Sequence, residues 1–134
     1  MGSEEGRLNG YVCNVWTTDT TPADNSGQAD GSMRKGSFTM IENGSVFCIL
    51  DIRSGVQQRV RRTDSIDYIV VMSDKIDMEL EAGDEVHLKA GDVMAQRGTV
   101  HNWINRGTES CVMAVVLVHA APVQAGGRTR EAFC

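Results

Sequence analysis

Asp67 and His101 are the two residues of this chain whose types best suit proton transfer. An imidazole titrates near neutral pH, and a neighbouring carboxylate holds its tautomer and favours its charged form. Arg61, which is always charged, can hold a carboxylate, phenolate or enolate oxygen, and Thr63 can add a hydrogen bond. Trp103 offers a flat wall to a ring or an enone. Such a set favours proton abstraction next to a carbonyl and stabilisation of the enolate that forms.

The spacing of these residues assigns them to the faces of two strands. Side chains alternate between the two faces of a strand, so positions 61, 63 and 67 share one face of the first strand. Positions 101, 103 and 105 share one face of the second strand, with Asn105 near its rim. Each strand therefore presents one row of candidate side chains on a single face.

Strands and turns fill almost the whole chain, and no segment keeps a helical period for more than two turns. Short strands separated by turns at this spacing predict an all-β sandwich or barrel. An Asn43-Gly44 turn after Ser37–Glu42 favours a hairpin with the strand that follows it. The expected strands are 10–17, 45–52, 61–72, 75–80, 85–89, 93–96, 100–104 and 111–118.

The composition of the chain limits the partners and the cellular location that we expect for the protein. The chain has 134 residues, a net charge of -5 and no apolar run of the roughly 20 residues that span a bilayer. We therefore expect no nucleic acid and no membrane as a partner. The N-terminus lacks the apolar core of a signal peptide, so a cytoplasmic location is expected. The four cysteines show no CxxC spacing, which favours reduced thiols.

The chain is expected to form one barrel with two appendages. Residues 1–36 form a strand and a polar loop that pack on the barrel, residues 37–120 form the barrel, and residues 121–134 form a tail. The tail is either loose or one short turn of helix. Both faces of the strand that contains Asp67 become apolar after Ile66, so both should be covered. A second copy or the N-terminal strands would cover the outer face, and we favour a homodimer.

Segments Arg61–Asp74 and Gly91–Asn105 resemble the two cupin motifs. In the first motif, His-x-His is followed by Glu and, six residues later, by Gly; here those positions hold Arg61, Thr63, Asp67 and Asp74. The second motif runs from Gly to a His and then an Asn, and it matches except for the usual proline and one residue of spacing. The likeness covers about residues 34–118 and resembles a branch of single-domain cupins common in fungi and bacteria, whose members often carry His at position 61.

The resemblance implies a cupin double-stranded β-helix, a jelly-roll barrel in which both rows of side chains converge on one pocket. Typical cupin metal sites use three histidines and a carboxylate, or two histidines and one carboxylate. Only Asp67 and His101 remain here, and Arg61 would place a fixed positive charge beside the ion. We therefore expect no metal cofactor. A magnesium or zinc ion, if bound, would be held by Asp67, His101 and waters.

Three functions are compatible with this pocket. The favoured one is a lyase or isomerase that acts on a carbonyl-containing organic acid or polyketide-like molecule, through dehydration, decarboxylation or double-bond migration. His101 and Asp67 would be catalytic, while Arg61, Thr63, Trp103 and Asn105 would bind substrate. The alternatives are a non-catalytic module that binds a small molecule and, more weakly, a metal-dependent dioxygenase. The fold alone does not choose between them.

Each site residue also has a structural alternative. His101 can form a hydrogen bond inside the barrel without reacting, and Asp67 can form a buried ion pair with Arg61. Arg61 can instead be a solvated charge at the barrel mouth, and Trp103 can belong to the core. His87 and His119 are expected to be a surface residue and a structural residue.

Overall fold

A computed structural model describes residues 2–5, 10–33, 40–56, 62–125 and 128–130, and these residues form an all-β structure. Arg61 lies outside this set. The alternation of apolar and polar residues appears directly as alternating burial, for example along Ser65–Ser73. A single turn of 3-10 helix, η1 (Gly31–Met33), interrupts the polar loop. The strands are β1 (Gly2–Glu5), β2 (Gly10–Thr18), β3 (Ser45–Ile52), β4 (Ser65–Ser73), β5 (Lys75–Leu80), β6 (Glu85–Lys89), β7 (Val93–Arg97), β8 (His101–Ile104), β9 (Cys111–His119), β10 (Val123–Ala125) and β11 (Arg128–Arg130).

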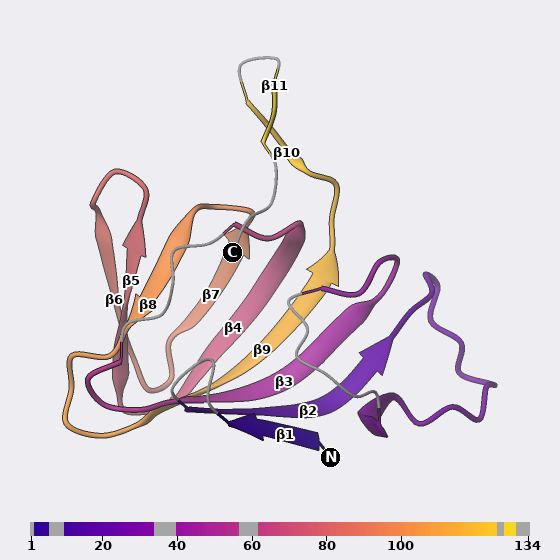
Figure 1. The fold of residues 1–134 in the computed structure, drawn as a ribbon, viewed down its shortest axis with the longest axis horizontal. Helices are drawn as coiled ribbons and strands as arrows, with labels where there is room; N and C mark the ends of the chain where they lie inside the picture. Colours follow the sequence, from indigo (N-terminus) through magenta and orange to yellow (C-terminus); the bar gives the residue numbers. More distant parts are fainter. Residues whose placement is uncertain (1, 6–9, 34–39, 57–61, 126–127, 131–134) are drawn as a thin grey trace.

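Two antiparallel sheets face each other (Figure 1). The larger sheet has the strand order β1-β2-β3-β9-β4-β7, and the smaller one has the order β6-β5-β8. Consecutive strands β4 and β5 belong to different sheets, as do β6 and β7, so the chain crosses repeatedly between the two layers. This arrangement directs the inward side chains of β4, β7 and β8 into one interior.

The core between the sheets consists of the inward residues of both layers. β9 contributes Cys111, Met113 and Val115, and β5 contributes Ile76 and Met78, all of them buried. Burying each such side chain contributes roughly 1.5–3 kcal/mol to folding. The described core therefore joins the two sheets that carry the candidate site residues.

The turn that follows β4 explains a departure from the cupin motif. Asp74 stands where the motif has glycine, and its φ is +60°, in the left-handed region. Asp is among the few residues other than glycine that adopt this conformation with any frequency. The aspartate thus preserves the turn, and the alignment of the first motif holds at this position.

Most strands predicted from the sequence are present, but the structure differs from the expected fold in three places, and each is an exception of a different kind. Residues 40–42 do not form the expected hairpin strand before Asn43-Gly44, and residues 37–39 lie outside the described set. In the tail, β10 pairs with β11, which replaces the expected loose segment or helical turn. Gly126-Gly127 in the sequence suits a two-residue hairpin loop, an indication that the sequence analysis passed over. Figure 1 shows this hairpin extending beyond the end of β9.

The third exception concerns the N-terminal strands. β2 pairs with β3, and β1 pairs with β2, so both strands extend the larger sheet sideways. They do not cover the outer face of β4, where Tyr68 and Met72 are more than half exposed. The N-terminal strands are therefore excluded as the cover of that face.

Candidate functional site

A chain of hydrogen bonds along β4 leads to Asp67. The side chains of Ser65 and Asp67 are buried on the inward face of this strand, and Thr63, which precedes the strand, is also buried. The Oγ of Ser65 donates to Oδ1 of Asp67 over 2.5 Å, and the hydroxyls of Thr63 and Ser65 lie 2.8 Å apart. The parity rule placed Thr63 and Asp67 correctly on one face, and Ser65 between them completes the row.

The hydrogen bond from Ser65 to Asp67 sets the direction of the one between Thr63 and Ser65. An ionised carboxylate only accepts, so Ser65 uses its single proton on Asp67. Thr63 must then donate to Ser65, because Ser65 has no second proton to give. With Asp67 ionised, Thr63 therefore offers only lone pairs to a bound molecule. This arrangement suits a substrate hydroxyl, enol or N–H group rather than an oxyanion.

A backbone carbonyl fixes the orientation of His101. The imidazole is 4% exposed, and its Nδ1 lies 2.8 Å from the carbonyl oxygen of Thr99. Since a carbonyl only accepts hydrogen bonds, Nδ1 carries a proton, and Nε2 is the basic atom of the neutral ring. The sequence analysis gave this tautomer-holding role to Asp67; in the structure the Thr99 carbonyl contacts Nδ1.

Gln96 connects the two halves of the site. On β7 it pairs in register with Asp67, and its side chain is 3% exposed. Its Nε2 donates to the hydroxyl of Thr99, whose carbonyl contacts His101, while its Oε1 is buried with no partner among the described residues. Sequence reasoning missed Gln96 because only the sheet topology shows that it lies beside Asp67. Ser65, by contrast, could have been found by parity.

The other predicted binding residues behave as structural ones. The ring of Trp103 is 3% exposed, belongs to the core and meets the His101 ring edge-on, with centroids 6.4 Å apart. Nδ2 of Asn105 donates to the carbonyls of Ile52 and Glu109, and its Oδ1 accepts from the backbone N–H of Gly107. Both amide protons are thus committed to the backbone, which leaves Asn105 no donor for a substrate.

A hollow of about 260 Å³ opens beside the buried hydroxyls. Thr63 and Ser65 line it, the mostly apolar segment 120–124 forms another wall, and the guanidinium-bearing Arg97 belongs to the same lining. A Cβ added at Gly98 would come within 2.4 Å of the Val123 side chain, so glycine permits the close approach of this segment. The predicted anion-holding residue, Arg61, lies outside the described residues.

Comparisons with known proteins identify relatives of this chain. No family model matches the chain. It is 38% identical over 121 residues to the phomopsin biosynthesis cluster protein D of Diaporthe leptostromiformis, covering 85% of this chain and 64% of that protein. It is 31% identical over 124 residues to the cupin-domain-containing oxidoreductase fogC of Aspergillus ruber, covering 89% and 61%. The chain thus spans less than two thirds of the length of either relative.

A solved structure shares the fold. The cupin 2 conserved barrel domain protein of Salinispora arenicola superposes with a TM-score of 0.60 over 89% of this chain and 82% of its own, at 14% identity. The chain belongs to the cupin family. This confirms the family and the double-stranded β-helix expected from the two motifs.

The residues of this cupin do not fit a typical cupin metal centre. Among the residues that the structure describes, no three His, Cys, Asp or Glu side chains lie close enough together to hold an ion. Asp67, which accepts from Ser65, and His101, whose Nδ1 contacts the Thr99 carbonyl, supply fewer ligands than the three or four of a typical centre. Thr63, at a motif histidine position, donates its proton to Ser65. We therefore derive no step through a metal.

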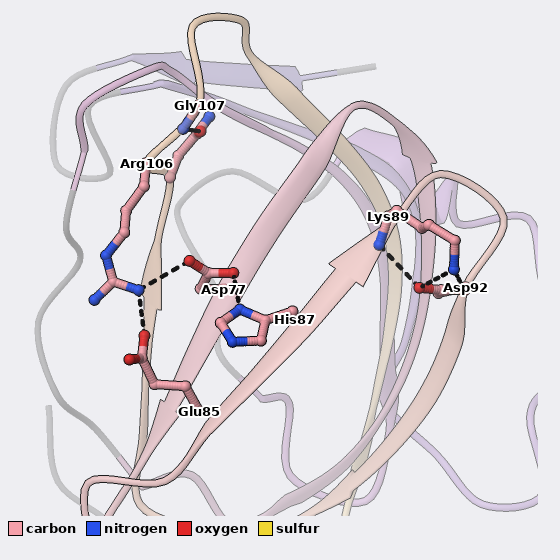
Figure 2. A network of polar contacts seen from close by, with 8 residues as sticks. Asp77, Glu85, His87, Lys89, Asp92, Arg106 and Gly107 are labelled. Carbon is pink, nitrogen blue, oxygen red and sulfur yellow. Dashed lines mark hydrogen bonds and ion pairs between the residues drawn. The ribbon is translucent and has the colours of Figure 1, made fainter.

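A second polar cluster lies on the outer face of the smaller sheet (Figure 2). Nδ1 of His87 lies 2.6 Å from one oxygen of Asp77, and Arg106 donates to the other over 2.9 Å and also to Glu85. The His87 side chain is 73% exposed, as expected for a surface residue.

His119 instead accepts a hydrogen bond from the backbone N–H of Asn43, which gives it a structural role. Among the described residues, no helix is long and apolar enough to cross a membrane.

The Asp77 cluster predicts a small acid-dependent loss of stability. Burial opposes ionisation of this carboxyl, but hydrogen bonds from His87 and Arg106 outweigh it and lower its pKa. Because its pKa is lowered in the folded state, the ionised carboxyl stabilises the fold above the unfolded pKa of about 3.9, and this stabilisation is lost as the pH falls through the folded-state pKa. We expect Asp77→Asn to cost less than about 1 kcal/mol at pH 7. Urea unfolding at pH 7 and at several pH values below 4 should show this difference shrink progressively as the pH falls, whereas a constant difference would contradict it.

Buried thiols in β3 and β9 predict slow chemical modification. Burial, together with the charges of Asp74 and Asp51, raises the pKa of Cys111 to about 11. At pH 8 this thiol stays protonated and unreactive, because the thiolate is the nucleophile. We expect iodoacetamide to label Cys111 and Cys48 only after unfolding, and the half-buried Cys13 sooner. Peptide mass spectrometry checks the order, and rapid labelling of Cys111 in the folded protein would contradict its burial.

Proposed function

We propose that this cupin is an enzyme of secondary-metabolite biosynthesis that transfers a proton on a small carbonyl-containing organic acid or polyketide-like molecule. The reaction is a dehydration, a decarboxylation or a double-bond migration. Biosynthetic relatives support the setting, since one carries the name of a phomopsin cluster and another that of a cupin-domain-containing oxidoreductase. The chemistry is inferred from the site.

The observation that most strongly supports this proposal is the hydrogen bond between His101 and the Thr99 carbonyl. It leaves Nε2 as the basic atom of a buried ring, the atom that takes a proton from carbon or returns one to it. Because this hydrogen bond also holds the ring in one orientation, the ring does not have to turn during the reaction. His101 is therefore the acid–base residue of the proposal.

The residues of β4 supply the polar wall of the proposed site. Asp67 accepts a hydrogen bond from Ser65, and in the proposal its carboxylate favours the imidazolium that forms when His101 accepts a proton. Thr63 accepts a hydrogen bond from a substrate hydroxyl or enol, as its committed proton requires. Arg61 keeps its expected role as the group that holds the substrate anion.

An oxidoreductase is the second candidate, because the relative from Aspergillus ruber is named as one. The two candidates differ in atom balance. An isomerase exchanges one substrate hydrogen with solvent and leaves the mass unchanged, while a lyase releases water or carbon dioxide. An oxidoreductase instead adds or removes two electrons, through hydrogen or oxygen, and needs a redox partner. A non-catalytic module would retain its ligand unchanged.

The test uses metabolites that accumulate in the source organism when the gene is deleted. Purified protein is incubated with this extract in D₂O, and masses are followed by high-resolution mass spectrometry. We expect a product that differs by loss of water or carbon dioxide, or an isomer that carries one deuterium. A two-electron mass change would support the oxidoreductase instead, and an unchanged bound metabolite would support the binding module.

A further inference from the structure

Gln96 has a buried side-chain oxygen to which the proposed reaction gives no role. The residue is 3% exposed, and its Nε2 donates to the hydroxyl of Thr99 over 2.9 Å. Its Oε1 is shielded from solvent and has no hydrogen-bond partner among the described residues. Buried acceptors in folded proteins are almost always paired with protein, water or a ligand. This oxygen therefore requires a partner that the described residues do not supply.

The Gln96 side chain lies on the inward face of β7, the strand beside β4 (Figure 1). Burial alternates along β7, where Gln96 is buried between the exposed residues Ala95 and Arg97. In the register of the two strands, Gln96 stands opposite Asp67. Directly opposite residues have Cβ atoms about 4.5–5.5 Å apart, so these two side chains are neighbours on one face.

The amide of Gln96 also extends toward His101. Its Nε2 contacts the Thr99 hydroxyl, and the Thr99 carbonyl contacts Nδ1 of His101, so a single residue connects Gln96 to the acid–base ring. The unpaired Oε1 therefore belongs to the polar region that links Asp67 with His101.

Two other side chains with buried atoms that lack a partner among the described residues point away from this interior. Asn102 pairs with Glu79 and lies on the face of β8 opposite His101. Asp51 lies on the outer face of the larger sheet, because it alternates with the buried inward positions of β3. Gln96, by contrast, combines an unpaired acceptor with a place beside the proposed acid–base residue.

We propose that Gln96 binds the substrate of the reaction proposed above, on which this role rests, through a hydrogen bond that its Oε1 accepts from a hydroxyl, enol or N–H group. An amide oxygen only accepts, so the group that pairs with it must donate. With Asp67 ionised, the hydroxyl of Thr63 gives its proton to Ser65 and likewise presents lone pairs. The site therefore offers a substrate two acceptors.

These two acceptors narrow the class of substrate. A molecule that pairs with both Gln96 and Thr63 carries two hydrogen-bond donors and is uncharged at that end. Phenols and enols of polyketide-like molecules have this character, whereas a carboxylate or enolate oxygen would meet lone pairs at both points and stay unpaired. A polyketide-like compound with hydroxyl or enol groups is thus the substrate class that fits these acceptors.

Resorcinol and 1,3-difluorobenzene test this substrate class without turnover. Both are flat, neutral rings of similar shape, and only resorcinol donates hydrogen bonds. Binding is followed in ¹H–¹⁵N correlation spectra of the unaltered protein, where shift changes at Thr63 and Thr99 locate the site. We expect resorcinol to bind at least about 10-fold more tightly than 1,3-difluorobenzene.

Variants of Gln96 and Thr99 assign the contact to Oε1. Gln96→Met removes both polar atoms and should abolish the preference for resorcinol. Gln96→Glu should keep it, because a carboxyl beside Asp67 is held protonated, so that its hydroxyl replaces Nε2 as the donor to Thr99 and its carbonyl oxygen replaces Oε1. Thr99→Val removes only the acceptor of Nε2 and should also retain the preference. Gln28→Met, the same change in the exposed loop, is the matched control, and circular dichroism shows that each variant is folded.

Three results would overturn this role of Gln96. Equal affinity for the two ring compounds, or no binding of resorcinol at about 10 mM, overturns the substrate class. A preference retained in Gln96→Met overturns the contact and indicates a trapped water as the partner of Oε1. A preference lost equally in Thr99→Val overturns it too, since Gln96 would then act only by supporting Thr99. Binding needs no proton transfer, so a lack of conversion in the D₂O experiment overturns the proposed reaction and not these affinities.

Discussion

Replacing His101 with glutamine is expected to lower turnover by about 100- to 10,000-fold, with the fold retained. Glutamine keeps a polar side chain of similar length but cannot exchange a proton with a carbon atom. Because the ring is buried and Nδ1 is committed to the Thr99 carbonyl, no other nitrogen of this residue is available for the reaction. Turnover is measured with the metabolite that the D₂O experiment identifies.

His87→Gln is the matched control for this prediction. It makes the same chemical change in an exposed histidine that also contacts a carboxylate, on the outer face of the smaller sheet. We expect this variant to keep full activity. Equal loss in both variants would point to a general effect on folding, and full activity of His101→Gln would remove the residue from the proposed mechanism.

Replacing Asn105 with alanine is expected to lower the free energy of unfolding by on the order of 3 kcal/mol. The change removes three hydrogen bonds and leaves the buried carbonyl of Ile52 without this donor. Asn105 itself is 1% exposed, so water cannot readily replace the lost contacts. Urea unfolding followed by tryptophan fluorescence provides the measurement.

Asn25→Ala, in the exposed polar loop, serves as the comparison and should change stability by no more than about 0.5 kcal/mol. The alternative for Asn105 is the substrate-binding role expected from its motif position. That role predicts an unchanged free energy of unfolding and a raised KM. A variant with this pair of results would contradict the structural role that the hydrogen bonds indicate.

The regular alternation of the sequence made most of the barrel predictable. Lys75–Leu80 and Glu85–Lys89 begin and end where the pattern placed them, because one face of each strand packs on the core while the other meets solvent. His101 was found differently, from its position in the second cupin motif. The strands Val123–Ala125 and Arg128–Arg130 were missed because each has only three residues, too few to show a period.

Contacts between distant strands limited the prediction of the site. Parity alone placed Thr63 beside Asp67, but the role of Gln96 depends on β7 pairing with β4. The partner of His101 is a backbone carbonyl, which no side-chain pattern reveals. Asn105 occupies its motif position for a structural reason, since its amide holds the turn that follows β8. Residue type and spacing therefore showed which side chains share a strand face, but not which partners those side chains have.

The protonation of the His101 ring tests the central claim most directly and needs no substrate. Long-range ¹H–¹⁵N correlation spectra of protein labelled at histidine distinguish the two nitrogens, and His101→Gln assigns the signal. We predict that at neutral to slightly alkaline pH Nδ1 carries the proton and Nε2 has the shift of an unprotonated nitrogen. A ring that carries its proton on Nε2 and leaves Nδ1 bare would contradict the proposed acid–base role.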